Sequence, residues 1–171
     1  MKRLFVLILL FSLLISCLGC GKNNEQFTKP AKFYYLNEEI TYGVEDGLIS
    51  YELQETNHIA GDLLQLLQQY QQGPVNKQLI STLPADVNIS SVVIQGGVIT
   101  VTTDVTFNQL NGMDRTIACA CISLTLLDYT GAEYVEFNIV DAFQNERERI
   151  IFSREDMHLL DHHTVPTESN P

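Results

Sequence analysis

Two segments with the hydrophobic period of an α-helix interrupt a series of strand-like segments, and this alternation constrains the fold more than any other sequence feature. The first helix is predicted by apolar residues that recur on one helical face, at Ile59, Leu63, Leu66, Leu67 and Tyr70. Thr56 or Asn57 can cap its start, since each side chain accepts a backbone N–H bond. Gly73 and Pro74 are expected to end it.

The outer face of this first helix is rich in glutamine, at residues 65, 68, 69, 71 and 72. Glutamine makes the face polar but leaves it uncharged. We expect this face to contact solvent, and a protein-contact surface is the alternative interpretation.

A second helix is predicted from about residue 115 to residue 129, with Asp114 as its cap and Gly131 at its end. The helical spacing is traced by Ile117, Cys121, Leu124 and either Leu127 or Asp128, and Ala118 widens the apolar stripe. Cys119 and Cys121 are separated by one residue, which is too close for an unstrained disulfide. We therefore expect both thiols to be free and in or near the core, since free cysteine behaves as a small apolar residue.

Strand-like segments surround the first helix. The aromatic run 33–36 and the extended segment 48–53 precede it. Two strands near 87–94 and 98–105 follow it. Gly96-Gly97 between these strands predicts a hairpin, because both glycines can adopt the positive φ of a tight turn.

The remaining strand signals follow the second helix. A strand is predicted at 134–140, then a charged turn at 145–149 and a short apolar run at 150–152. The order of elements is therefore β-β-α-β-β-α-β, with a further short strand at the end. This order predicts an α+β fold, a two-layer sandwich with both helices on one face of a mainly antiparallel sheet.

The N-terminus has the proportions of a secretory signal. Lys2 and Arg3 precede an apolar run of about a dozen residues, which is shorter than the roughly 20 residues of a membrane-spanning helix. The run ends in Leu14-Ile15-Ser16-Cys17. This resembles the lipobox of bacterial lipoproteins, in which the cysteine is acylated and the signal is cut just before it. We expect lipidation of Cys17, with Cys20 as the second candidate; a plain cleaved signal or an uncleaved anchor is the alternative.

Four segments follow from this pattern. They are a signal peptide at 1–16, a lipid anchor and flexible tether at 17–31, one domain at 32–153 and a polar C-terminal tail at 154–171. Removal of the signal takes away Lys2 and Arg3 and changes the formal charge from −11 to −13. We expect no nucleic-acid partner, because so acidic a surface repels phosphate.

An ordered set of segments between about residues 31 and 141 carries a family resemblance. The segments are Phe33-Tyr34-Tyr35-Leu36, Leu63-Leu64-x-Leu66-Leu67 with Gly73-Pro74, Leu79-x-Ser81-x-Leu83-Pro84, Val92–Val101 around Gly96-Gly97, Ile117–Leu127 with Leu124-Thr125-Leu126, and Val135-x-Phe137. Together they resemble the GerM domain, which is named for a bacterial sporulation and germination lipoprotein. The chain is similar to a form with a single such domain, whereas the name-giving protein carries two.

The resemblance implies a fold related to the ring-building motif of secretion-like sporulation complexes. It also implies a non-enzymatic role in cell-envelope assembly, sporulation or germination. The lipobox agrees with this interpretation, because GerM proteins are typically lipoproteins.

No motif in the sequence predicts a catalytic or metal site. His158 and His162 would share one face of a helix, beside Asp161, but no third ligand is well placed for zinc; the other histidines are His58 and His163. The acidic pairs 38–39 and 45–46 lie in predicted turns, where carboxylates are solvated. We therefore expect no catalytic residue, no metal and no cofactor.

These observations predict a lipoprotein that is held by its lipid on the extracytoplasmic face of the cell membrane and is not an enzyme. We expect the domain to bind other envelope proteins or itself through an exposed sheet edge or a helix face. The alternative is a lipoprotein that binds a small ligand or a peptidoglycan fragment, which would require a concave pocket with convergent polar groups.

Overall fold

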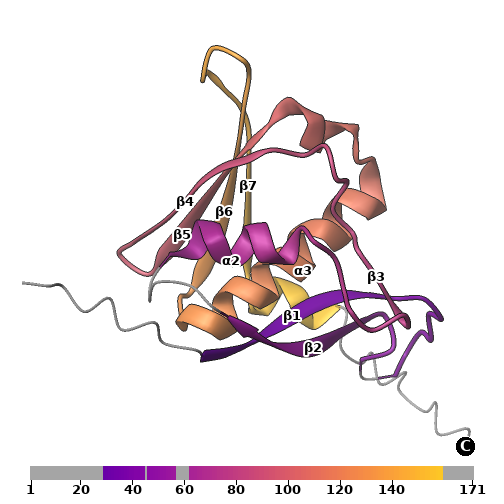
Figure 1. Cartoon of the computed structure of the whole chain (residues 1–171). Helices are drawn as coiled ribbons and strands as arrows, with labels where there is room; N and C mark the ends of the chain where they lie inside the picture. Colours follow the sequence, from indigo (N-terminus) through magenta and orange to yellow (C-terminus); the bar gives the residue numbers. More distant parts are fainter. Residues whose placement is uncertain (1–28, 45, 57–61, 160–171) are drawn as a thin grey trace, which may run out of the picture.

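The computed structural model describes residues 29–44, 46–56 and 62–159, with side chains through Met157. Within these residues the strands form two separate sheets (Figure 1). The first sheet has the order β2-β1-β3 and consists of β1 (Lys29–Asn37), β2 (Ile49–Thr56) and β3 (Leu79–Ile80). The second has the order β4-β5-β6-β7 and consists of β4 (Ile89–Gln95), β5 (Val98–Asp104), β6 (Tyr134–Val140) and β7 (Glu146–Ser153).

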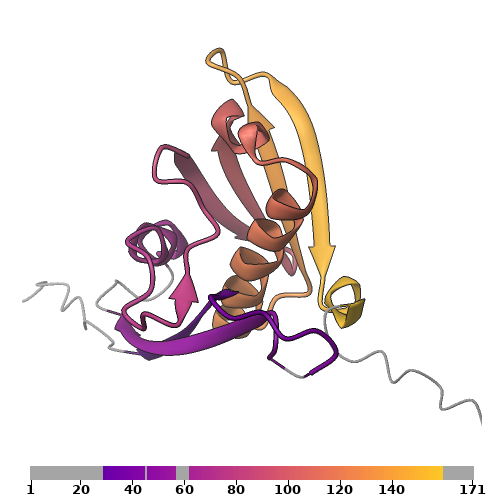
Figure 2. The same ribbon diagram turned by 90° about the vertical axis from the view of Figure 1, so that its right-hand side faces the viewer.

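Among the described residues, α2 (Leu63–Tyr70) lies in chain order between β2 and β3 of the first sheet. The short 3-10 helix η1 (Val105–Gln109) and α3 (Gly112–Thr130) lie in chain order between β5 and β6 of the second, and the 3-10 helix η2 (Glu155–Leu159) follows β7. α3 lies between the two sheets and contacts β1 on one side and β6 and β7 on the other (Figure 2). One continuous hydrophobic core therefore joins both sheets.

The predicted α+β class is confirmed, since the described part of the chain has two α-helices and mainly antiparallel strands. The strands are divided between two sheets, however, where one sheet was expected. The N–H of Tyr34 explains the division, because it donates to Oγ1 of Thr125 on α3 at 3.1 Å. The edge of β1 that faces away from β2 is thus covered by α3 at Tyr34 and pairs with β3 at Leu36 and Asn37, so no strand of the second sheet can pair there.

The connection through η1 and α3 makes β5 and β6 parallel neighbours, since it returns the chain to the end of the sheet where β5 began. The other strand pairs are antiparallel. The hairpin at Gly96-Gly97 is confirmed, with φ of 59° and 83° at these glycines.

The start of α2 differs from the prediction. The helix begins at Leu63, and its cap is Asp62, whose carboxylate accepts a bond from the N–H of Gln65 at 3.0 Å. Thr56, predicted as a possible cap, is instead the last residue of β2, and its hydroxyl donates to the carbonyl of Lys29 at 2.6 Å. Asn57 and Ile59 lie outside the described residues.

α3 is longer than predicted. It begins at Gly112 with Asn111 as its N-cap, so Asp114 lies in the first turn and is not the cap. The predicted end is confirmed, since Gly131 adopts a left-handed conformation with φ of 75°. Cys119 and Cys121 are both buried and form no disulfide with a described residue, as expected.

The C-terminal part of the domain also differs from the prediction. The turn between β6 and β7 is formed around Asp141, whose carboxylate accepts bonds from the N–H groups of Phe143 and Asn145 at 2.8 and 2.9 Å. The charged segment at 146–149, predicted as a turn, is the first half of β7. η2 lies in the segment predicted as a polar tail, and its Met157 is buried in the core.

Candidate functional site

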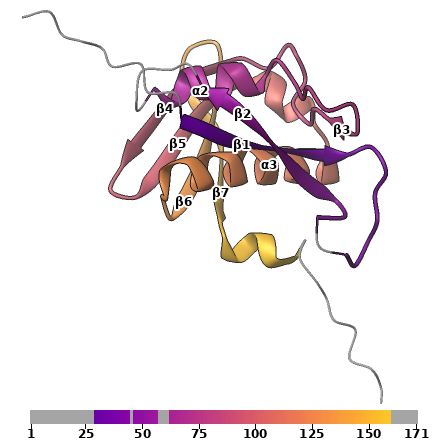
Figure 3. The ribbon, with the colours of Figure 1, turned by 60° about the horizontal axis from the view of Figure 1, so that its bottom comes forward.

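The two faces of the β1–β2 pair have different surroundings. Phe33 and Tyr35 point inward and stack on Tyr70 of α2, and the rings of Tyr35 and Tyr70 are 4.8 Å apart. The opposite face carries Lys32, Tyr34, Tyr51 and Leu53, which we call the outer face. β1 and β2 lie at the surface of the molecule beside α3 in Figure 3.

The outer face exposes apolar side chains. Leu53 is 66% exposed and Tyr51 is 43% exposed. The ring of Tyr51 lies 5.4 Å from that of Tyr34, and Nζ of Lys32 lies 4.6 Å above the Tyr51 ring. Attraction between the ammonium group and the ring holds this surface in place.

Asp128 of α3 fixes one side of the outer face. Its carboxylate accepts a hydrogen bond from the Tyr34 hydroxyl at 2.5 Å and one from Arg154 at 2.5 Å, and Nζ of Lys32 lies 3.5 Å away. Three groups from β1 and from the segment after β7 therefore meet on one carboxylate.

The electrostatics of this cluster keep Asp128 ionised. Partial burial alone would raise the pKa of Asp128, but the hydrogen bonds from Tyr34 and Arg154 and the charges of Arg154 and Lys32 outweigh it and lower that pKa. Burial, together with the bond to Asp128, raises the pKa of Tyr34. The tyrosine therefore stays protonated and the carboxylate stays charged.

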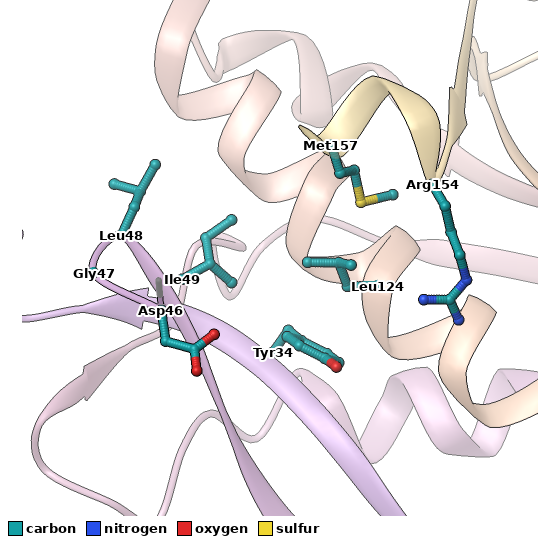
Figure 4. A pocket seen from close by; sticks show the side chains of 8 residues that line it. All are labelled: Tyr34, Asp46, Gly47, Leu48, Ile49, Leu124, Arg154 and Met157. Atoms are coloured by element: carbon teal, nitrogen blue, oxygen red, sulfur yellow. The ribbon is translucent and has the colours of Figure 1, made fainter. Parts of the chain in front are cut away.

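A cavity opens beside this cluster, between the first sheet and η2 (Figure 4). It holds about 210 Å³. Leu124 and Met157 form its apolar wall, and Tyr34 and Arg154 lie at its polar side. The cavity is small, and two of its polar side chains, Tyr34 and Arg154, are already bonded to Asp128; Asp46 also lines it.

The outer edge of β2 is open within the described residues. The N–H of Asn37 donates to the carbonyl of Leu48, whereas the N–H of Tyr34 points the other way, to Thr125. Because antiparallel partners alternate, residues 49, 51, 53 and 55 of β2 direct their backbone groups away from β1. The carbonyl of Glu55 accepts a bond from the side chain of Gln69, which agrees with this direction.

The buried thiols offer no reactive site. Burial raises the pKa of both Cys119 and Cys121 to about 12, so the thiol form persists at neutral pH and the nucleophilic thiolate is scarce. This agrees with their expected place in the core.

Most of the residues predicted as lipidation sites or considered as metal ligands lie outside the described part of the chain. Cys17, Cys20, His58, His162 and His163 lie outside the described residues, as does the His158 side chain. Among the described residues, no three His, Cys, Asp or Glu side chains are placed to hold a metal ion. In the same part of the chain, no helix is long and apolar enough to cross a membrane.

Sequence reasoning missed the cluster around Asp128. No local signal links Asp128 to Arg154, which lies 26 residues later in the segment predicted as a tail. The alternation of Tyr51 and Leu53 along β2 was the one available signal for the outer face, because a strand with one face in solvent seldom places two large apolar residues there.

The comparisons with known proteins define the family. The model of the family Germane, described as sporulation and spore germination, matches residues 32–142. The chain therefore belongs to the Germane family, and its domain is GerM-like, as the resemblance indicated. No curated protein matches the sequence.

Two solved structures are similar to the chain. The tandem GerMN domains of the sporulation protein GerM from Bacillus subtilis match with a TM-score of 0.50 and 20% identity, over 77% of this chain and 47% of that one. This chain thus spans about half the length of the GerM structure, and the likeness supports the fold. A candidate lipoprotein from Clostridium perfringens matches with a TM-score of 0.42 and 21% identity, over 82% of this chain and 97% of that one.

Proposed function

We propose that this protein is a lipoprotein, tethered by Cys17 or, as the second choice, Cys20 to the extracytoplasmic face of the cell membrane. Its GerM-like domain binds envelope proteins or a second copy of itself and catalyses no reaction. The process it serves is sporulation, germination or another step of envelope assembly, in keeping with the description of the family.

The observation that carries this proposal is the exposed outer face beside an open strand edge. Tyrosine is enriched in protein interfaces, and a central aromatic or aliphatic anchor with charged neighbours is the usual arrangement of a contact site. Tyr51 and Leu53 supply such an anchor, and Lys32 and Arg154 lie next to it.

The alternative, binding of a small ligand, has less support. Two cavities, one beside Leu83 and one beside Cys119, hold about 300 and 350 Å³, at the lower limit of the roughly 300–1,000 Å³ of typical ligand sites. The cavity beside Tyr34 holds about 210 Å³, and its Tyr34 and Arg154 side chains are bonded to Asp128 instead of pointing at an empty centre. We therefore favour a protein partner over a small solute.

A cross-linked pull-down from intact cells tests the proposal. The full-length, C-terminally tagged protein is compared with the variants Leu53→Lys and Ile151→Lys. Both positions are solvent-exposed aliphatic residues on edge strands, at 66% and 55% exposure, but they lie on different sheets. Loss of cross-linked partners only in Leu53→Lys supports the proposal. An unchanged set of partners in Leu53→Lys would contradict it, as would recovery of the wild-type protein only as a monomer that is cross-linked to no protein.

A further inference from the structure

The open edge of β2 can bind another strand through its backbone. The N–H groups of Tyr51 and Leu53 point outward and donate to no group in the described part of the chain. Unpaired edge groups of this kind are a template for strand addition, and proteins usually block them with charge, proline or a bulge. The middle of β2 has no proline, and its pairing with β1 shows no bulge.

The edge of β7 provides a contrast within the same molecule. β7 also pairs on one side only, but its first four residues are Glu146, Arg147, Glu148 and Arg149. Their charged side chains protect that edge against the approach of another strand. Of these two edges, β2 is the one suited to pairing; the other edge of the second sheet, β4, has an irregular register between Ile89 and Ser91.

The sequence of β2 is complementary to itself when two copies run antiparallel with Leu53 on the symmetry axis. In this register Leu53 lies opposite Leu53 of the second copy, and both direct their backbone groups into the seam. Tyr51 lies opposite Glu55, so the phenol hydroxyl faces a carboxylate acceptor, and Glu52 lies opposite Gln54. No two like charges are opposed, and cross-strand pairs of this kind stabilise a sheet.

Two neighbouring registers also match the backbone groups, and both are less favourable. One places Glu52 directly opposite Glu52 of the second copy, at a closely spaced position where like charges repel; the other centres on Gln54 and pairs only residues 52–56 of the strand. The register with Leu53 on the axis avoids this repulsion and also pairs the whole segment from residue 50 to residue 56.

The glutamine face of α2 agrees with the same arrangement. Gln69 bonds to the side chain of Gln54 and to the carbonyl of Glu55, which points into the seam, so α2 lies over the inner face close to the edge. This carbonyl has a second lone pair, which accepts the N–H of Tyr51 of the second copy in the proposed register. A symmetry axis perpendicular to the sheet would place both copies of α2 on one side of the seam. Glutamine both donates and accepts hydrogen bonds, so such a face can approach a copy of itself without charge repulsion.

We propose that two copies of this chain associate through antiparallel β2 edges with Leu53 at the two-fold axis, joining two three-stranded sheets into one. The inference rests on the proposed function and names the partner of its interaction surface. The lipid anchor supports it, because confinement to one membrane raises the effective concentration of a partner whose contact area is modest.

Thiol cross-linking in intact cells tests this geometry. The full-length lipoprotein carries Leu53→Cys in a Cys20→Ser background, and cells are treated with a bismaleimide of short spacer. Facing residues of a hydrogen-bonded pair have Cα atoms about 5.5 Å apart, so the two new thiols are within reach. Cys119 and Cys121 are buried and do not compete. We expect a covalent dimer from most of the folded protein.

Matched variants establish the register. Tyr51→Cys alone is expected to give little dimer, because the two positions are offset by four residues, about 13 Å along the strand. Mixed with Glu55→Cys, it is expected to give a heterodimer. Ile151→Cys on β7 measures the background from collisions.

The outcomes separate this inference from the proposed function. Absence of dimer from lipidated Leu53→Cys overturns the inference, and so does equal cross-linking at Leu53 and Ile151. If dimer is absent while Leu53→Lys still loses another envelope protein in the pull-down, the proposed function stands without self-association. If neither experiment depends on Leu53, both proposals are wrong.

Discussion

The hydroxyl of Tyr34 donates a hydrogen bond to the carboxylate of Asp128 at 2.5 Å, and this bond connects the first sheet to the central helix. The backbone N–H of the same tyrosine donates to Thr125, one helical turn earlier on α3. One residue of β1 therefore fixes both the position of the strand edge and the direction of the outer face.

Replacement of Tyr34 by phenylalanine is expected to destabilise the domain by about 1.5–3 kcal/mol, the usual range for loss of a hydrogen bond to a charged group. The ring is kept, so its packing on Tyr51 persists. Denaturant unfolding of the full-length protein measures the change. The control is Tyr51→Phe, whose hydroxyl has no partner among the described residues and whose loss is expected to have little effect. Equal effects of the two variants would contradict the structural role of the Tyr34–Asp128 bond.

Asp128 predicts a dependence of stability on pH. Its pKa in the folded state is lowered below the usual value of an aspartate by Tyr34, Arg154 and Lys32, so the stabilisation is present above the unfolded pKa and is lost as the pH falls through the folded pKa. Asp128→Asn is therefore expected to be less stable than the wild type at pH 7, and the difference is expected to shrink below about pH 4. Unfolding free energies of both proteins at a series of pH values measure this, and a constant difference down to pH 3 would disagree with it.

The two buried thiols predict slow chemical modification. Cys119 and Cys121 have pKa values raised by burial to about 12, and neither side chain is open to solvent. We expect the helix that carries them to remain unlabelled by a maleimide in the native state at pH 7.5 and to take two labels after unfolding. Peptide mass spectrometry measures this, and rapid native labelling of either residue would show that α3 is accessible.

Much of the local structure could be predicted from the sequence, because it depends on neighbouring residues. The hairpin at Gly96-Gly97, the bounds of β6 and the end of α3 at Gly131 follow from turn chemistry and hydrophobic period. Helix starts were less well predicted. The cap of α2 is Asp62 and not Thr56, because Thr56 belongs to β2 and its hydroxyl is bonded to the Lys29 carbonyl.

The division into two sheets could not be predicted, since a period of two identifies a strand but not its partner. The deciding contact is a buried threonine hydroxyl on α3 that covers the edge of β1. The same limit applies to the candidate site. Arg154 and Asp128 come together because the segment that leads into η2 lies beside the end of α3. This contact could not be predicted, because the polar sequence after β7 has the composition of a tail.

The lipid anchor gives the last prediction, which concerns the N-terminus. In the expected reaction the thiol of the lipobox cysteine carries the diacylglyceryl group, so replacement of that residue removes the attachment point. Cys17→Ala is expected to abolish incorporation of an alkyne-labelled fatty acid and to block cleavage of the signal, whereas Cys20→Ala is expected to retain both.

Two acyl chains hold a protein stably on a bilayer, whereas a single chain binds only marginally. The Cys20→Ala protein should therefore fractionate with membranes under high salt. Labelling followed by gel analysis distinguishes the cases. Loss of label in Cys20→Ala alone would assign the lipid to Cys20, and unchanged labelling in both variants would exclude each cysteine as the sole site.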